Sequence, residues 1–252
     1  MSLIRSHGFY DRVLEGWLTV HKFGSNPAIT TATDPEEIWS VGGVFTYANQ
    51  FPAAAATVTL VCASANDDIA GTGARTVTIE GINGAGAELS QTVNCEGNDG
   101  AGGITAVPVD LKRVHRMYVA SVGAGATHTN VGAIDATIGG NVVAQIEAGA
   151  GQTEMAVYTV PTGYSKYYLT NWSVRVSGIV AAAEAYCTLM LHRSGVVRHQ
   201  GDVVSVKTGT TLADVRLDNW ITLLAGDDVW IRVQDVSATT AVAGTFDIVG
   251  IP

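Results

Sequence analysis

The stretch from residue 66 to residue 81, NDDIAGTGARTVTIEG, contains two adjacent acids, a Gly-x-Gly and an arginine. These residue types occur in phosphate and metal sites. A phosphate-binding glycine loop has to open a helix, because backbone N–H groups at a helix N-terminus point at the anion. The residues after Gly73 alternate like a β-strand, and the P-loop lysine is missing. We interpret Gly71 and Gly73 as positions of positive φ in a sharp turn into a strand.

The acids of this turn raise a second possibility. Asn66, Asp67 and Asp68 carry oxygen atoms that calcium accepts as ligands, but three consecutive side chains do not easily converge on one ion. The sequence therefore favours an acidic, solvated turn, with calcium binding as the alternative. It predicts no metal site and no cofactor.

Histidines and cysteines also give no catalytic or zinc signature. The six histidines are scattered, and neither H-E-x-x-H nor a Gly-x-Ser-x-Gly elbow occurs. A triad whose members meet only in space is not excluded by this. Cys62, Cys95 and Cys187 are far apart in the chain, which predicts buried or half-buried thiols and not a disulfide framework. We expect no enzymatic activity.

Two acidic pairs and the tryptophans have structural explanations. Asp227-Asp228 follows Ala225-Gly226 and is interpreted as a turn. Asp34-Pro35-Glu36-Glu37 has the pattern of a short helix start. Tryptophans can form a sugar-binding platform, but at alternating strand positions we favour the core. The tryptophans concerned are Trp39, Trp172, Trp220 and Trp230.

Composition limits the protein class. The chain has 252 residues, of which 47% are hydrophobic and 15% charged, enough for two ordinary domains. Its formal net charge of −9 argues against nucleic acid and anionic membranes as partners. The sequence has no apolar run of about 18 residues, the length a membrane span needs. We also expect no export signal, because the N-terminus lacks an apolar core.

Alternating apolar and polar residues, separated by Gly, Asp and Asn turns, predict an all-β protein. We expect two β-sandwich or jelly-roll-like domains, at residues 46–145 and 146–252, after an N-terminal arm of residues 1–45 with short helical turns. The glycine-rich segment 139–151 is the expected boundary. The predicted strands are 57–62, 75–82, 87–95, 114–122, 133–138, 155–160, 168–176, 185–192, 195–206, 220–224, 228–233 and 245–249.

The sequence resembles a group of virion structural proteins of tailed bacteriophages. The resemblance runs from about residue 26 to residue 168. It rests on the Asp-rich turn with Gly-x-Gly-x-Arg, the strand ending in Glu-Gly, a second strand of acidic or Ser/Thr residues, the Asn-Val-Gly turn in THTNVGAI (127–134), and the Tyr-Thr-Val-Pro-x-Gly turn in GQTEMAVYTVPTGYSKYY (151–168). Gln91 and Asn94 depart from the pattern, where more acid or a leucine is expected. The resemblance implies a role in the particle and carries no catalytic residues.

The function expected from this resemblance is that of a capsid cement or decoration protein. Its partners would be the major capsid protein or other virion proteins and further copies of itself, as a homo-oligomer, with three copies suggested by family habit. It would be found in the virion, after assembly in the bacterial host cytoplasm. We expect the arm to dock on a neighbour through aromatic and apolar anchors. These anchors are Phe9, Tyr10, Trp17, Leu18, Phe23 and Trp39.

Two other functions stay open at the level of sequence. A tail, neck or knob protein would bind host glycans through exposed Tyr and Trp residues, such as Tyr164, Tyr167 and Tyr168. A virion-borne glycan hydrolase would need two carboxylates at a fixed separation in one cleft.

Overall fold

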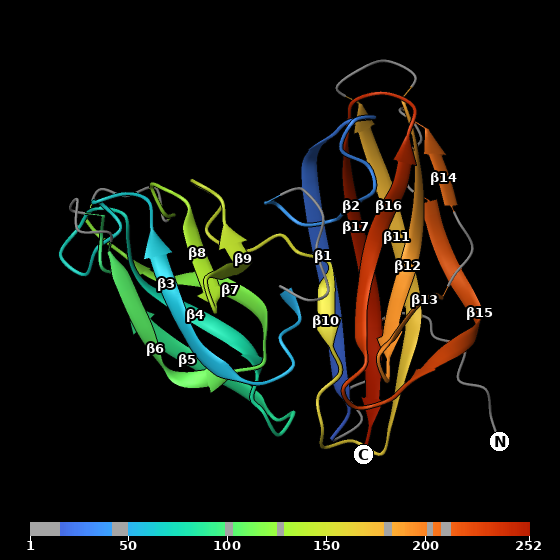
Figure 1. The fold of residues 1–252 in the computed structure, drawn as a ribbon, viewed down its shortest axis with the longest axis horizontal. Helices are drawn as coiled ribbons and strands as arrows, with labels where there is room; N and C mark the ends of the chain where they lie inside the picture. Colours follow the sequence, from blue (N-terminus) through green and yellow to red (C-terminus); the bar gives the residue numbers. More distant parts are fainter. Residues whose placement is uncertain are drawn as a thin grey trace.

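The structure is a computed structural model that describes residues 16–41, 50–98, 103–124, 129–178, 183–200, 204–207 and 213–252. Every named secondary-structure element in these residues is a β-strand. The expected all-β class is therefore confirmed. The strands form four sheets that lie in two units side by side (Figure 1).

One unit, which we call the inserted unit, contains the sheets β6-β3-β8-β9 and β5-β4-β7. Its two sheets share one hydrophobic core. The strands are β3 (Ala56–Cys62), β4 (Ala74–Ile82), β5 (Glu88–Asn94), β6 (Ile104–Leu111), β7 (Arg113–Val122), β8 (Ile134–Ile138) and β9 (Asn141–Ile146).

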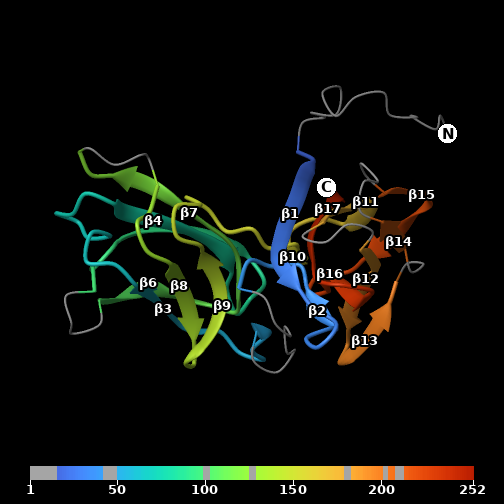
Figure 2. The same ribbon diagram turned by 90° about the horizontal axis from the view of Figure 1, so that it is seen from above.

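The other unit, which we call the split unit, is built from both ends of the described chain. One sheet has the order β1-β17-β11-β15, and the other has the order β10-β16-β12 with β13 and β14 beside β12 and β2 beside β16. Figure 2 shows β1 next to β17 from above. The strands are β1 (Leu18–Ile29), β2 (Glu36–Glu37), β10 (Val157–Thr159), β11 (Lys166–Gly178), β12 (Glu184–Arg193), β13 (Val196–His199), β14 (Val204–Lys207), β15 (Ala213–Leu223), β16 (Asp228–Val236) and β17 (Thr240–Ile251).

The strands follow from the two-residue side-chain period of β-structure. In β3, Val58, Leu60 and Cys62 are buried, while the residues between them are not. In β4, Val77 and Ile79 are buried in the same core. The hairpin predicted around Asn83 is also present, since β4 pairs with β5 along its length.

A β-bulge changes the faces of β11. The register with β17 shifts between Leu169 and Asn171, so β11 gains one residue there relative to β17. Trp172 therefore continues the buried face that Tyr167 and Leu169 begin, although the spacing is odd. Sequence alternation predicted the inward face from Trp172 onward but left Tyr167 on the surface.

The structure places both strands in the described part of the predicted arm, residues 1–45, in the split unit. β1 pairs with β17 from Leu18 to Ile29, and β2 pairs with β16. The predicted helical turn at residues 34–37 is wrong. Glu36 and Glu37 are buried on a short strand, where Glu37 forms an ion pair with Arg232 and the amide of Asn26 donates a hydrogen bond to Glu36.

The Gly139-Gly140 pair lies within the inserted unit and does not end it. Both glycines have positive φ, at 59° and 85°, and they connect β8 to β9 in a hairpin. The chain crosses back to the split unit after β9, close to the predicted boundary at residue 145. Residues 30–156, which include the short strand β2, thus stand between β1 and β10 of the split unit.

Candidate functional site at the interface between the two units

The acidic turn at residues 66–68 holds neighbouring loops together, and we call it the Asp67 clasp. Asp67 is fully buried, so the prediction of a solvated turn is wrong for this residue. Its carboxylate accepts hydrogen bonds from the backbone N–H groups of Ala74 (2.8 Å), Val131 (2.8 Å) and Gly132 (2.7 Å). Asp68 accepts from the N–H groups at positions 70 and 97, which lowers the pKa of its carboxyl. These acids hold loops together.

The two glycines of this turn are needed for close approach and not for positive φ. Neither has a positive φ. A Cβ on Gly73 would lie 2.2 Å from the Asp67 carboxylate, and a Cβ on Gly71 would lie 2.2 Å from the Asn66 carbonyl oxygen. Glycine therefore permits the carboxylate of Asp67 to reach the backbone that it binds.

The predicted docking residues are spread over different environments. Phe9 and Tyr10 lie outside the described residues. Trp17, Leu18 and Phe23 are half-buried at and in β1, while Trp39 is only 3% exposed within the core of the inserted unit. Trp39 is therefore not available to a partner, and docking through the other residues stays a prediction.

A buried ion pair joins the two units. Arg113 of β7 donates from Nε and Nη2 to the carboxylate of Asp228 in β16, at 3.0 and 3.3 Å. Thr159 donates to the same carboxylate at 2.5 Å, and Nδ1 of His192 lies 3.3 Å from it. The remaining guanidinium nitrogen of Arg113 donates to the carbonyl oxygens of residues 52 and 112. Asp228 is thus part of a buried network and not simply of a turn.

Apolar packing beside this ion pair also joins the two units, and we call the ion pair and this packing together the joint. Trp230 of β16 lies 5.5 Å from Phe51 between ring centroids, and the guanidinium of Arg113 lies 4.9 Å from the Phe51 ring. Met190 and Trp39 belong to the same core. The core of the inserted unit therefore extends onto the outer face of a sheet of the split unit, which fixes the two units against each other.

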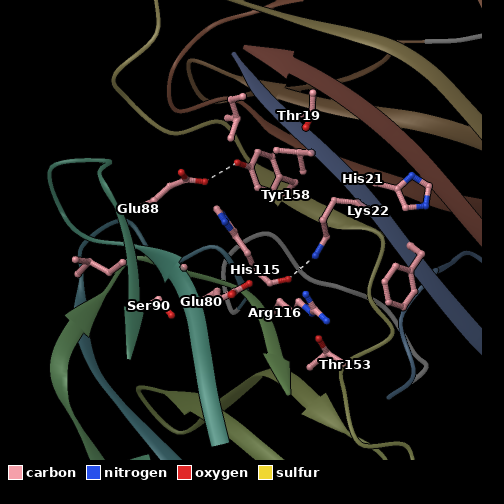
Figure 3. A pocket seen from close by; sticks show the side chains of 15 residues that line it. Thr19, His21, Lys22, Glu80, Glu88, Ser90, His115, Arg116, Thr153 and Tyr158 are labelled. Carbon is pink, nitrogen blue, oxygen red and sulfur yellow. Dashed lines mark hydrogen bonds between the residues drawn. The ribbon is translucent and has the colours of Figure 1, made fainter. Parts of the chain in front are cut away.

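Beside this joint lies a cleft of about 480 Å³, lined by β1 on one side and by β4, β5 and β7 on the other (Figure 3). Lys22 of β1 points into it with 8% of the residue exposed, and its ammonium donates to the carbonyl oxygen of His115. Burial, and secondarily the charge of Arg116, lowers the pKa of Lys22 to about 7. The cleft thus contains a lysine that titrates near neutral pH.

An aromatic wall closes one side of the cleft. The rings of His115 and Tyr158 lie 4.3 Å apart, and the Tyr158 hydroxyl donates to Glu88 at 3.0 Å. Burial and the nearby charges of Lys22 and Arg113 hold the pKa of His115 well below its usual value. The backbone N–H of Thr159 donates to Nε2 of His115, which is the bond of a neutral ring.

Two carboxylates line this cleft, Glu80 of β4 and Glu88 of β5. In the register of the hairpin, Glu80 lies opposite Ser90 and Glu88 lies opposite Ile82, so the two acids are diagonal neighbours. The cleft therefore meets one requirement of a glycan hydrolase, that of two acids near each other, while Glu88 is already bound to Tyr158.

Sequence patterns did not identify the residues of this interface. The only local signal is a set of polar and cationic residues, Arg113, His115 and Arg116, in a strand that otherwise alternates. Among the tryptophans, Trp39, Trp172 and Trp230 are buried, as expected, but Trp220 is 42% exposed. Its ring lies 5.7 Å from that of Tyr168.

The described residues offer few other sites. All three cysteines are buried and free, as the sequence predicted for the thiols. Among the described residues, no group of three or more His, Cys, Asp or Glu side chains is placed to hold a metal ion. In the same part of the chain, no helix is long and apolar enough to cross a membrane.

Comparison with known proteins gives little support for any family. No family model and no curated protein matches the chain. Two solved structures from infectious bursal disease virus are similar in part. The structure of the Gt strain is 12% identical, with 97% of this chain and 84% of that chain covered and a TM-score of 0.16. The VP2 subviral particle is 9% identical, with 94% and 81% covered and a TM-score of 0.13. At these TM-scores the similarity carries no argument.

Proposed function

We propose that the protein is a non-enzymatic structural component of a tailed-phage virion, and that its split unit is a jelly roll. The nested order of its strands supports this. β1 pairs with β17, β10 with β16, β11 with β15 and β12 with β14. Among these eight strands the first therefore pairs with the last, the second with the second to last, and so on inward to the fourth and fifth.

This nesting is what a jelly roll requires. Its eight strands form one long ribbon of four antiparallel pairs, which rolls up into two facing sheets. The β11–β17 and β12–β16 pairs close the two sheets of the split unit in this way. Jelly rolls are common in viral capsid proteins and in lectins. Together with the sequence resemblance to tailed-phage virion proteins, this favours a role in the particle.

Within the particle we propose a cement or decoration role on the capsid, as a homo-oligomer of three copies that binds the major capsid protein. The inserted unit and the split unit are fixed together by the Arg113–Asp228 joint, so the protein would act as a rigid two-part clamp. Assembly would take place in the host cytoplasm. Half-buried Trp17, Leu18 and Phe23, on the edge strand β1 or next to it, are the described anchors proposed for a neighbour.

Copy number per virion tests this position. Quantitative mass spectrometry of purified particles, normalised to the major capsid protein, is expected to give a ratio near one. A ratio of a few per cent would overturn the cement role and favour the neck, tail or a vertex.

A host-glycan-binding role is the second candidate, because the exposed ring of Trp220 lies beside the half-buried ring of Tyr168 on one sheet of the split unit. Tyr167 does not take part, since it is buried in the core. Glycan-array binding that is lost in Trp220→Ala and Tyr168→Ala would support this role. Tyr186→Ala is the matched control, because Tyr186 is a similarly exposed aromatic on another strand.

The non-enzymatic assignment has its own test. Purified protein is incubated with capsular or lipopolysaccharide glycans of the host, and newly released reducing ends are measured. We expect none above background. Release that disappears in Glu80→Gln would overturn the assignment and would place a hydrolase in the cleft between the units.

A further inference from the structure

The floor of the cleft between the units holds two cations without a carboxylate partner. Among the described residues, neither Lys22 nor Arg116 has a carboxylate oxygen within 4 Å. Lys22 donates to a carbonyl oxygen, and Arg116 donates from Nη2 to Gln152 at 2.9 Å. Nε of Arg116 is buried and has no hydrogen-bond partner in the described part of the chain.

Such an arrangement lowers the stability of the folded protein when no ligand is bound. A buried charge is tolerated when it is paired and hydrogen-bonded, and an unsatisfied buried donor costs stability. The Lys22 ammonium and the Arg116 guanidinium also repel each other, which contributes to the low pKa of Lys22. An apolar residue at position 22 would avoid this cost, so the lysine is better explained by something that binds to it.

Titratable side chains line the cleft around Lys22 from every neighbouring element. His21 lies beside it in β1, Glu80 faces it from β4 and Glu88 from β5, His115 and Arg116 from β7, and Tyr158 from β10. Glu80 partly offsets the two cations, and Glu88 is engaged by the Tyr158 hydroxyl. In formal charge Glu80 and Glu88 balance Lys22 and Arg116, but among the described residues neither carboxylate lies within 4 Å of the two cations, so both cations can still pair with an anionic group.

The rest of the lining indicates a ligand with hydroxyl groups and an apolar face. Ser90 and Thr19 carry hydroxyl groups at the lining, while Val20 and Phe23 present apolar surface. The hydroxyl of Thr153 is already bound to the backbone of Met117. A volume of about 480 Å³ lies within the range of small-molecule sites in proteins. We propose that the cleft binds a small sugar acid, whose carboxylate lies between the Lys22 ammonium and the Arg116 guanidinium.

Binding of this kind is linked to protons. A carboxylate beside Lys22 stabilises the ammonium form and raises the pKa of the lysine from its value of about 7 in the free protein. Above that pH the complex must take up a proton, so affinity falls by up to about tenfold per pH unit. His21, at the rim of the cleft, is paired with Asp247.

The test measures binding of sodium D-glucuronate to the full chain by isothermal titration calorimetry at pH 6.5 and pH 8.5. D-Glucose is the matched ligand, because it has the same ring without the carboxylate. We expect saturable glucuronate binding that weakens at least about tenfold at the higher pH, and no binding of glucose. Equal binding of the two sugars, no saturable binding, or tighter binding of inorganic phosphate would overturn the proposal.

Variants separate this site from nonspecific binding. Lys22→Met and Arg116→Gln should each weaken glucuronate binding by about tenfold or more. Lys207→Met should leave it unchanged, because Lys207 is an exposed lysine on β14. Proton uptake, measured in buffers of different ionisation enthalpy, should persist in His21→Asn and disappear in Lys22→Met. If Lys22→Met does not fold, the Arg116→Gln variant and the pH dependence of the unmodified protein decide. Unchanged binding in Arg116→Gln contradicts the site.

Discussion

Arg113 and Asp228 stand 115 positions apart in the chain and meet in a two-point ion pair between the inserted unit and the split unit. Both side chains are almost fully buried, at 6% and 1% exposure. Because the pair lies beside the shared apolar core of Trp230 and Phe51, electrostatic and apolar contacts act on the same joint. The relative position of the two units is therefore set by specific side chains.

Removal of one partner of this pair should be strongly destabilising. Arg113→Met leaves the Asp228 carboxylate buried without its cationic partner. We expect a loss of about 3–5 kcal/mol in the free energy of unfolding. Urea denaturation measures this loss. Arg175→Met, at an exposed arginine of β11, is the control and should change stability by less than about 0.5 kcal/mol. The double variant Arg113→Met/Asp228→Asn should cost less than the sum of the single variants, and strict additivity would contradict a direct pair.

The clasp made by Asp67 gives a second prediction. Asp67→Ala leaves three backbone N–H groups without their acceptor, which should cost about 3–5 kcal/mol of stability. Hydrogen exchange should become faster at the amides of Ala74, Val131 and Gly132 before it does elsewhere. Unchanged exchange at these amides would show that the carboxylate does not hold the two loops. Added calcium should not restore stability to this variant or raise that of the unmodified protein.

Close backbone packing at Gly24 of β1 predicts a sharp difference between two glycines. A Cβ at Gly24 would lie 2.3 Å from the backbone nitrogen of Ala156 and 2.6 Å from the carbonyl oxygen of Ile38, and backbone cannot move aside easily. Gly24→Ala should therefore cost about 3 kcal/mol. Gly84→Ala is the control, since its Cβ would meet only the Ala55 side chain at an ordinary 3.4 Å. Similar thermal unfolding of the two variants would be inconsistent with this packing.

The low pKa of Lys22 predicts a pH-dependent stability. The folded state holds the pKa at about 7, below its ordinary value of 10.5, so the unfolded chain binds more protons between these two values. Stability of the free protein should rise with pH in this window, by up to about 2–3 kcal/mol between pH 7 and pH 9. The penalty is fully present below pH 7.

The comparison variant for this effect is Lys22→Met. Its stability relative to the unmodified protein should be greatest near pH 6 and should decrease as the pH rises toward 9, as followed by urea denaturation. Lys207→Met should show no such trend. A difference between Lys22→Met and the unmodified protein that does not vary with pH would mean that Lys22 keeps its charge throughout.

Local patterns predicted those strands whose faces are set by one buried side. β3 and β4 alternate as expected, because Val58, Leu60, Val77 and Ile79 face one core. β1 was not predicted, since one of its edges pairs with β17 while its side chains also meet the inserted unit across the cleft, which obscures the period of two.

The interface between the units could not be predicted from the sequence, for a different reason. The side chains that contact Asp228 come from β7, β10 and β12. Nothing in the local sequence around residue 228 indicates which arginine it will pair with. Likewise, Lys22 looks like an ordinary exposed residue of a polar strand. Its burial results from the packing of two units, and such long-range contacts leave no short-range pattern.

The pairing of β1 with β17 also constrains how the protein can be made. During synthesis the strand from Leu18 to Ile29 is made before the inserted unit, whereas its partner from Thr240 to Ile251 is made long after it. Strands β3 to β9 can form their own two sheets meanwhile, because all of their strand partners lie among these seven strands. Closure of the split unit therefore has to wait until β17 has been made, and until then β1 lacks its partner strand while the inserted unit can already fold.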